Sequence, residues 1–319
     1  MSTELVAIDP PAANLPALGP VDVLAAFLAG RNPRTLLAYD KDLADFGRFL
    51  GRDNSRGAVE QLLNLPQGHA NATALAYKAH LIDRDLKAAT IARRLAALRS
   101  VVKMARTVGR VVWTLDVDSP KTEPYRDTTG PGDAGWRAML AVAKREAESG
   151  RPKPIRDLAI LRTLHDLALR RGELVAIDLA DVDLEGATVA VVGKGHTDAS
   201  RLTLPDPTRD ALEAWIASRG SEPGPLFVRL DRAAQGPDRL TDTGVYLIIR
   251  AFGRKAALSR PTRPHGLRHQ AITKALDATQ GDIRTVKRFS RHADVRTLLL
   301  YDDRRCDLAG DVARLVAED

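Results

Sequence analysis

The chain of 319 residues has one cysteine, Cys306, so it cannot form an internal disulfide, and a single thiol cannot build a zinc site. No apolar run of about 18 residues occurs, which excludes a membrane-spanning helix. Residues 1–19 lack a basic segment followed by an apolar one, so we expect a flexible leader rather than a secretory signal. Aromatic residues make up only 4%, so the cores must rest on aliphatic side chains. These absences predict a cytoplasmic protein with no membrane partner.

The charge is uneven along the chain. The net charge is +7, and residues 21–115 hold 15 lysines and arginines against 8 acidic residues, whereas residues 116–319 hold 33 against 31. A basic first part joined to a nearly neutral second part suggests a partner with regularly spaced negative charge, of which nucleic acid is the commonest. Arginine enrichment from coding bias would give the same excess, so charge alone leaves both explanations open.

The first part of the chain has the pattern of a helical bundle. Asn32 followed by Pro33 is a strong helix start, and apolar residues recur at helical spacing from Leu36 to Leu50. A second amphipathic segment follows Thr90, with basic residues on its other faces. Shorter helices are predicted at 21–28, 58–63 and 72–83. We therefore predict a helical domain over residues 20–115.

Prolines and glycines mark a break after this domain. Six of them fall between residues 116 and 135 among charged residues and threonines, which predicts a linker over 116–134. The remainder, 135–319, is predicted to be a second domain, mostly α with a small β-sheet. Its sheet is a hairpin of 187–192 and 201–204 around the polar tip Gly193-Lys194-Gly195. Its helices are predicted at 136–148, 155–169, 208–218, 242–257, 266–277, 283–289 and 307–316.

Four short stretches of the second domain carry the candidate functional residues. Each stretch alone has a plainer explanation: a surface arginine, a turn lysine, a capped helix start and a core tyrosine. Their order along the chain is more informative than any one of them. In that order the candidates are Arg170, Glu173, Lys194, His265, Arg268, His292 and Tyr301.

Together these residues suit the cleavage of a phosphodiester, which passes through a state with extra charge on the non-bridging oxygens. Arg170 and Arg268 could clamp those oxygens through the planar, permanently charged guanidinium fork, with a further hydrogen bond from the later histidine. A tyrosine hydroxyl can form a covalent intermediate, but its pKa of about 10 calls for a nearby base or a positive field, for which His265 and the arginines are candidates. Lys194 on the hairpin is a candidate general acid for the departing 5′-oxygen.

The same residues resemble the catalytic set of the tyrosine recombinase (phage integrase) family. Residues 169–174 resemble its Leu-Arg-x-x-Glu-Leu box, residues 193–195 its hairpin lysine, and residues 265–269 its His-x-Leu-Arg-His motif. The nine-residue step from His292 to Tyr301 matches the family spacing. Stretches after Thr35 and Thr90 are similar to the family's core-binding domain, so the resemblance covers roughly the whole chain after residue 20.

This resemblance implies a helical, SAM-like core-binding domain and a mixed α/β catalytic domain that clamp double-stranded DNA. It further implies inverted-repeat half-sites, self-association to a dimer and a tetramer on DNA, and strand exchange through a Holliday junction. Tyr301 would form a 3′-phosphotyrosyl intermediate, with no metal and no cofactor. Arg170, Arg268 and His292 would stabilise the phosphate, and Glu173 is interpreted as a structural residue that holds the turn of Arg170.

Several positions depart from the family pattern, although none removes a candidate catalytic group. Arg171 stands where an aliphatic residue is usual, and Arg291 stands where glycine usually precedes the histidine. Arg201 lies seven residues after Lys194 rather than the commoner five, so the hairpin tip is longer. Pro131-Gly132 replaces the Leu-Thr of many relatives.

Two other functions remain open, a type IB topoisomerase-like relaxation of DNA and a catalytically silent DNA-binding accessory protein. The helical first domain and the short length argue against the topoisomerase, and the intact candidate set argues against a binder, which needs only phosphate contacts. We expect a nucleoid-associated protein. The residues expected to contact DNA from the first domain are Arg34, Lys41, Arg93, Arg94, Arg99 and Lys103.

Overall fold

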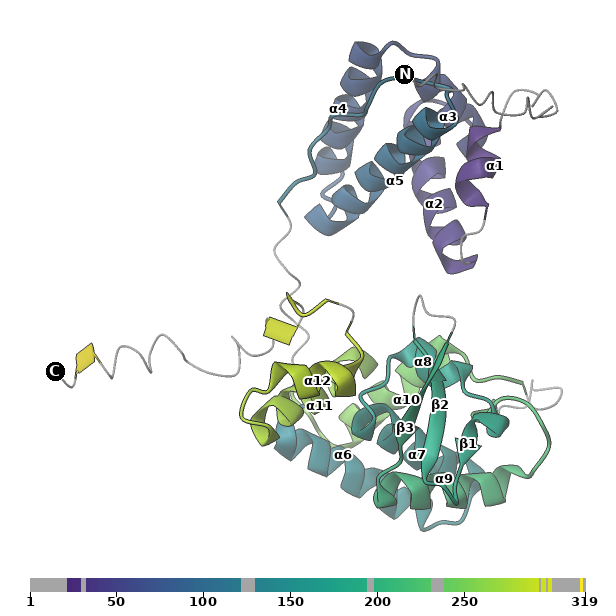
Figure 1. Cartoon of the computed structure of the whole chain (residues 1–319), viewed down its shortest axis with the longest axis vertical. Coiled ribbons are helices and arrows are strands. Elements are labelled where there is room, and N and C mark those ends of the chain that lie inside the picture. The colour runs from purple at the N-terminus through teal and green to yellow at the C-terminus, as the bar shows by residue number, and fades with distance from the viewer. Residues whose placement is uncertain are drawn as a thin grey trace, which may run out of the picture. The chain divides into compact units, whose positions relative to one another are not determined.

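A computed structural model describes residues 22–29, 33–121, 130–193, 198–230, 238–292, 294–296, 298–299 and 316–317. The chain divides into two compact units, Met1–Pro124 and Tyr125–Asp319. The first runs from purple to blue in Figure 1 and the second from teal to yellow. Each unit buries its own apolar core, so each is described separately.

The first unit is a bundle of helices in the regions that the sequence predicts, although two of them begin at Ser55 and Gln67 rather than at 58 and 72. They are α1 (Val23–Leu28), α2 (Pro33–Phe49), α3 (Ser55–Leu63), α4 (Gln67–Asp83) and α5 (Ala88–Thr107). The predicted cap Asn32 lies outside the described residues. Asp22 caps α1 and Asn54 caps α3, each through a side-chain oxygen that accepts a backbone N–H of the first turn.

Two buried carboxylates of α2, Asp42 and Asp45, tie this helix to its neighbours. Asp45 accepts a hydrogen bond from the Tyr77 hydroxyl (2.8 Å) and from Arg84 Nη1 (3.1 Å) and Arg94 Nη1 (2.5 Å). Burial by itself raises the pKa of Asp45, but the hydrogen bonds from Tyr77 and Arg84 outweigh it and lower that pKa on balance. The helices of the first unit therefore meet at a buried ionic centre as well as at an apolar core.

Replacing Asp45 with alanine should destabilise the first unit by about 3 kcal/mol, because it leaves the Tyr77 hydroxyl and the mostly buried Arg94 without their acceptor. Urea denaturation followed by circular dichroism measures the change. Asp53→Ala, at an exposed position of the same unit, is the matched control and should cost less than about 0.5 kcal/mol. Equal effects from the two changes would show that the ionic centre does not stabilise the fold.

The second unit combines helices with one small antiparallel sheet. Its helices are α6 (Gly132–Ala147), α7 (Pro152–Asp166), α8 (Arg171–Ala176), α9 (Asp206–Arg219), α10 (Asp242–Lys255), α11 (Pro264–Ala278) and α12 (Ile283–Ser290), with a 3-10 turn η1 (Leu179–Asp181). The strands β1 (Val182–Asp183), β2 (Thr188–Val192) and β3 (Ala199–Thr203) lie in the order β1-β2-β3, with Ala190 opposite Arg201. The mostly helical fold and the predicted hairpin are confirmed.

Some predicted limits differ from the observed ones. The helix predicted over 155–169 ends at Asp166, because Ala168 adopts a left-handed φ of +46° that ends the helix. The helix α6 begins at Gly132, inside the predicted linker, and Val117 packs into the core of the first unit. The helix predicted over 307–316 lies outside the described residues except at its end. Because residues 122–129 also lie outside them, the domain limits at 115 and 135 stay a prediction.

Two apolar clusters pack beneath the end of the second unit at which the candidate residues lie. The larger one surrounds α7, whose Ala159, Ile160 and Leu161 are fully buried. The smaller one joins Ala168 to α11 and α12, which lie side by side (Figure 1). The turn before α8, the start of α11 and the end of α12 are therefore fixed relative to one another. No helix in the described part of the chain is long and apolar enough to cross a membrane.

Candidate active site

The bend between α7 and α8 presents Arg170. Leu167, Ala168 and Leu169 are all buried, and they anchor the bend in the core. Arg170 then caps α8: its backbone N–H donates to Glu173 Oε2 (2.9 Å) and its Nη1 donates to Glu173 Oε1 (2.6 Å). The side chain of Arg170 keeps a third of its surface exposed, so the guanidinium is held on one side and open on the other.

Glu173 is the buried anion of the site. Besides Arg170 it accepts a hydrogen bond from Arg291 Nη2 (3.2 Å), and Arg268 Nη1 lies 4.0 Å from its Oε2. Burial by itself raises the pKa of Glu173, but the hydrogen bonds from Arg170 and the charge of Arg291 outweigh it and hold this pKa below its usual range. The carboxylate thus binds both Arg170 and Arg291, and the structural role of Glu173 stays a prediction.

Arg268 on α11 joins three segments that are far apart in the sequence. It is 1% exposed, and its Nη1 donates to the carbonyl of Ala168 in the bend before Arg170. Its Nη2 donates to the carbonyl of Ser290 at the end of α12 (2.5 Å) and lies 3.4 Å from His292 Nε2. The positions of Arg170, Arg268 and His292 are therefore coupled through one guanidinium.

The two candidate histidines lie in the positive field of these arginines. His292 Nδ1 lies 2.9 Å from the Ser290 hydroxyl, and burial, followed by the charges of Arg268 and Arg170, lowers the pKa of His292 to about 4. Burial of the imidazole and the same two charges also lower the pKa of His265, on the first turn of α11. Both imidazoles are therefore neutral at pH 7, and each can donate one hydrogen bond and accept one.

The structure thus brings together Arg170, Glu173, Arg268 and His292, with His265 in the same field. Lys194 and Tyr301 lie outside the described residues. The hairpin that carries Lys194 is described up to Gly193 and again from Asp198, and the chain before Tyr301 is described to Leu299, with Leu298 buried against α11 and α12. No group of three or more His, Cys, Asp or Glu side chains in the described ranges is arranged to hold a metal ion.

The basic residues expected to contact DNA differ in their surroundings. Arg94 is 14% exposed and paired with Asp45, and Arg99 donates to the carbonyl of Val117 (2.6 Å) and to the Ser119 hydroxyl (2.9 Å). These two guanidiniums hold the first unit together. Arg93 remains half exposed beside Asp42, and both candidate lysines are exposed. The side chain of Arg34 lies outside the described residues, so DNA contact by these six residues stays a prediction.

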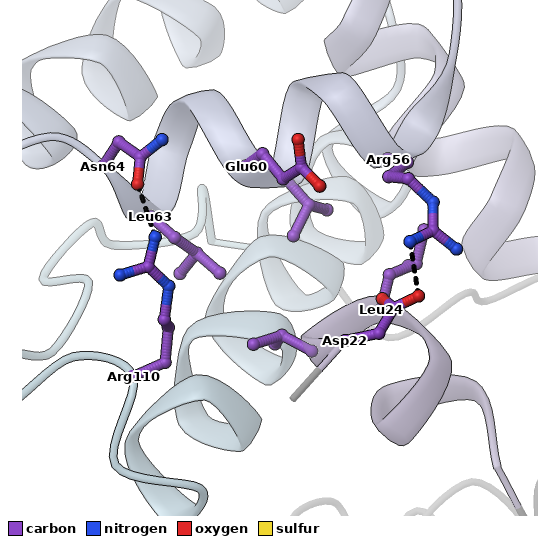
Figure 2. A pocket seen from close by; sticks show the side chains of 9 residues that line it. Asp22, Leu24, Arg56, Glu60, Leu63, Asn64 and Arg110 are labelled. Atoms are coloured by element: carbon purple, nitrogen blue, oxygen red, sulfur yellow. Dashed lines mark hydrogen bonds and ion pairs between the residues drawn. The ribbon is translucent and has the colours of Figure 1, made fainter. Parts of the chain in front are cut away.

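A cavity in the first unit is separate from all of these candidates. It measures about 370 Å³ and lies among α1, α3 and the chain after α5. Figure 2 shows two pairs among its side chains, Arg56 with Asp22 and Arg110 with Asn64, and Glu60 on the same helix as Arg56 and Asn64. The lining holds two carboxylates and two arginines, so it carries no net formal charge.

Arg291 is the residue of the site that the motif did not assign. Its guanidinium shares Glu173 with Arg170, although the sequence marks it only as an arginine where glycine is usual. Arg171, the other unusual arginine, faces Asp242 of α10, with Nε 3.9 Å from Oδ2. At both positions, the sequence signal was a charged residue where the resembled family usually has a small or an aliphatic one.

Comparison with known proteins identifies the family to which the chain belongs. Residues 136–305 match the phage integrase family, and residues 26–109 match the N-terminal SAM-like domain of phage integrases. A tyrosine recombinase of Synechococcus elongatus is 39% identical over 95% of this chain and 96% of its own length. A tyrosine recombinase of a Synechocystis species is 37% identical over 90% of this chain and 92% of its own. The chain therefore belongs to the phage integrase family, and it is a tyrosine recombinase, an enzyme that breaks and rejoins DNA strands.

Solved structures agree on the fold. The XerH recombinase bound to a palindromic difH substrate covers 90% of this chain and 80% of its own, with a TM-score of 0.65 and 17% identity. A lambda integrase dimer bound to a COC′ core site covers 89% of this chain and 78% of its own, with a TM-score of 0.62 and 15% identity. At this level of identity the likeness supports the two-part architecture and the predicted fold class.

The lowered pKa of His292 has a measurable consequence. We expect the imidazole of His292 to titrate near pH 4 in the free protein, far below a free histidine, because burial and the charges of Arg268 and Arg170 disfavour its protonated form. NMR of histidine-labelled protein, with His292→Gln for assignment, measures this. A bound oxyanion should raise the value because it offsets both charges. Titration of His292 near pH 6.5 in the free protein would contradict the buried cationic site.

Proposed function

We propose that this chain is a site-specific recombinase in which Tyr301 attacks a DNA phosphate and forms a 3′-phosphotyrosine. The observation that carries the proposal is the cluster of Arg170, Arg268 and His292. Arg170 binds the buried Glu173, and Arg268 lies 4.0 Å from that carboxylate and 3.4 Å from His292. Guanidinium groups fixed before the substrate arrives stabilise developing charge on phosphate oxygens without reorganisation. That arrangement suits a phosphoryl transfer in which the protein supplies the positive charge.

The remaining roles follow from the chemistry of the step. The Tyr301 oxygen forms a bond to phosphorus as the bond to the 5′-oxygen breaks, and the departing oxygen takes a proton from Lys194. His265, neutral at pH 7, accepts or orients the proton of the attacking hydroxyl. Attack of a 5′-hydroxyl from another strand on the phosphotyrosine reverses these bond changes. The bond energy is conserved, so the reaction needs no nucleotide.

We assign DNA recognition to both units and catalysis to the second. The lambda integrase structures include a dimer bound to a core site and a tetramer bound to a Holliday junction. By analogy, this chain is proposed to bind double-stranded DNA with inverted-repeat half-sites and to assemble into a dimer and a tetramer. Strand exchange through a Holliday junction then joins the partners. No observation favours the topoisomerase or the silent accessory protein.

Replacing Tyr301 with phenylalanine should abolish the covalent adduct and leave DNA binding intact, because only the nucleophilic oxygen is lost. A nicked duplex that traps the cleaved strand, resolved on a denaturing gel in the presence of EDTA, measures the adduct. Gel shift on the intact duplex is the control for binding. An adduct formed by Tyr301→Phe would exclude this residue as the nucleophile, and loss of the wild-type adduct in EDTA would count against phosphate stabilisation by arginines alone.

Replacing Lys194 with alanine should slow cleavage of ordinary DNA by about 100-fold, a typical loss for a general acid. A substrate with sulfur in place of the leaving 5′-oxygen should restore the rate, because a thiolate leaves without protonation. His196→Ala, two residues further along the same hairpin tip, is the matched control and should not respond to the sulfur. Failure of the sulfur substrate to rescue Lys194→Ala would assign the acid to another group.

A further inference from the structure

Arg291 occupies a backbone position that disfavours its own side chain. It ends α12 in the left-handed conformation, with φ +55° and ψ 38°, and its N–H donates to the carbonyl of Lys287. Glycine is the residue that adopts this conformation without steric penalty, and glycine is what usually precedes the histidine in the resembled family. An arginine at this position indicates that its side chain makes contacts that offset the strain.

Those contacts are directed into the protein. The side chain is 12% exposed, and its Nη2 donates to Glu173 Oε2 at 3.2 Å. Nη1 and Nη2 both lie 3.3 Å from the carbonyl of Leu167, and Nη2 lies at the same distance from the carbonyl of Ala168. These two carbonyls follow the last turn of α7, where helix carbonyls lack partners and where a cation interacts favourably with the helix dipole.

The bend that Arg291 holds is the one that presents Arg170. Ala168 has a left-handed φ of +46°, and its carbonyl accepts from Arg268 as well as from Arg291. Glu173, three residues after Arg170, binds Arg170 and Arg291 at the same time. Arg291 therefore contacts the chain on both sides of Arg170, at the strained bend before it and at the carboxylate after it.

We propose that Arg291 is a positioning residue for the strand-cleavage step, acting through Glu173 and the carbonyls of Leu167 and Ala168 to fix the guanidinium of Arg170. This inference rests on the proposed function. Without Arg291, the bend loses three of its hydrogen bonds, and Glu173 loses one of its donors. After Arg170, the nearest cation to the carboxylate is then Arg268 Nη1, which lies 4.0 Å away and can turn toward it. Both phosphate clamps would shift together.

The test separates positioning from folding and from direct contact with DNA. Full-length wild type, Arg291→Gly and Arg291→Lys are compared on the trapping duplex at saturating protein in a single turnover. The measured quantities are the rate constant of adduct formation, the final fraction of adduct and the Kd for the uncut duplex. Glycine suits the left-handed backbone, so Arg291→Gly removes the guanidinium without adding strain, and lysine restores the charge without the planar fork.

We expect Arg291→Gly to lower the rate constant about 100-fold, the loss expected from a small misplacement of a catalytic group. The Kd should stay within about twofold and the final fraction of adduct should be kept. Arg291→Lys should recover part of the rate. Two controls should match wild type: Gln280→Gly, an exposed residue with a φ of +52° at the end of α11, and Arg288→Ala, an exposed arginine on α12.

A double variant tests the route through the carboxylate. If Arg291 acts on Arg170 partly through Glu173, then Arg291→Gly should slow Glu173→Gln less than it slows wild type, and the slowing that remains measures the route through the carbonyls of Leu167 and Ala168. A weakened Kd with an unchanged rate at saturation would overturn the proposal in favour of a phosphate contact. A smaller final fraction of adduct with an unchanged rate constant would overturn it in favour of a folding role. Absence of adduct from wild type itself would refute the proposed function instead.

Discussion

The structure of the site depends on one buried negative charge, the carboxylate of Glu173. A charge removed from water is stable only if it is paired and hydrogen-bonded, and Glu173 satisfies this requirement with Arg170 and Arg291 while Arg268 lies just beyond contact. Three guanidiniums facing one carboxylate leave an excess of positive charge. In the proposed function, an oxyanion that enters the site offsets that excess, so the pairing that stabilises the folded protein also prepares it for a phosphate.

This preparation carries a conformational cost. Ala168 and Arg291 both adopt left-handed backbone conformations, and a residue held in such a conformation costs about 1–3 kcal/mol unless its surroundings compensate. The compensation consists of the buried side chain of Ala168 and the hydrogen bonds of two arginines to its carbonyl. Burial and the charges of Arg268 and Arg170 lower the pKa of His292 and keep its imidazole neutral. A single arrangement of side chains therefore accounts for the backbone strain at Ala168 and Arg291, the pairing of Glu173 and the low proton affinity of His292.

The sequence predicts most of the helices, the hairpin and the order of the candidate residues, because these depend on local periodicity and on spacing within a motif. It does not predict α8, which is too short to show a period, or the end of α7, which depends on the left-handed Ala168. The partners of Arg268 are backbone carbonyls from two distant segments, and no motif can indicate them. The role of Arg291 is hidden for the same reason, since its acceptors become neighbours only in the folded chain.

Buried carboxylates pair with arginines in the first unit as well, and this pairing bears on how its basic residues are interpreted. The excess of basic residues over 21–115 suggests a broad contact with DNA, yet Asp42 and Asp45 neutralise Arg84 and Arg94 and half-cover Arg93. Arg99 is engaged with the chain after α5. Each phosphate neutralised by a cation contributes to the salt dependence of binding, and cations already paired within the protein contribute little. We therefore propose that exposed lysines such as Lys41 and Lys103 make phosphate contacts from this unit.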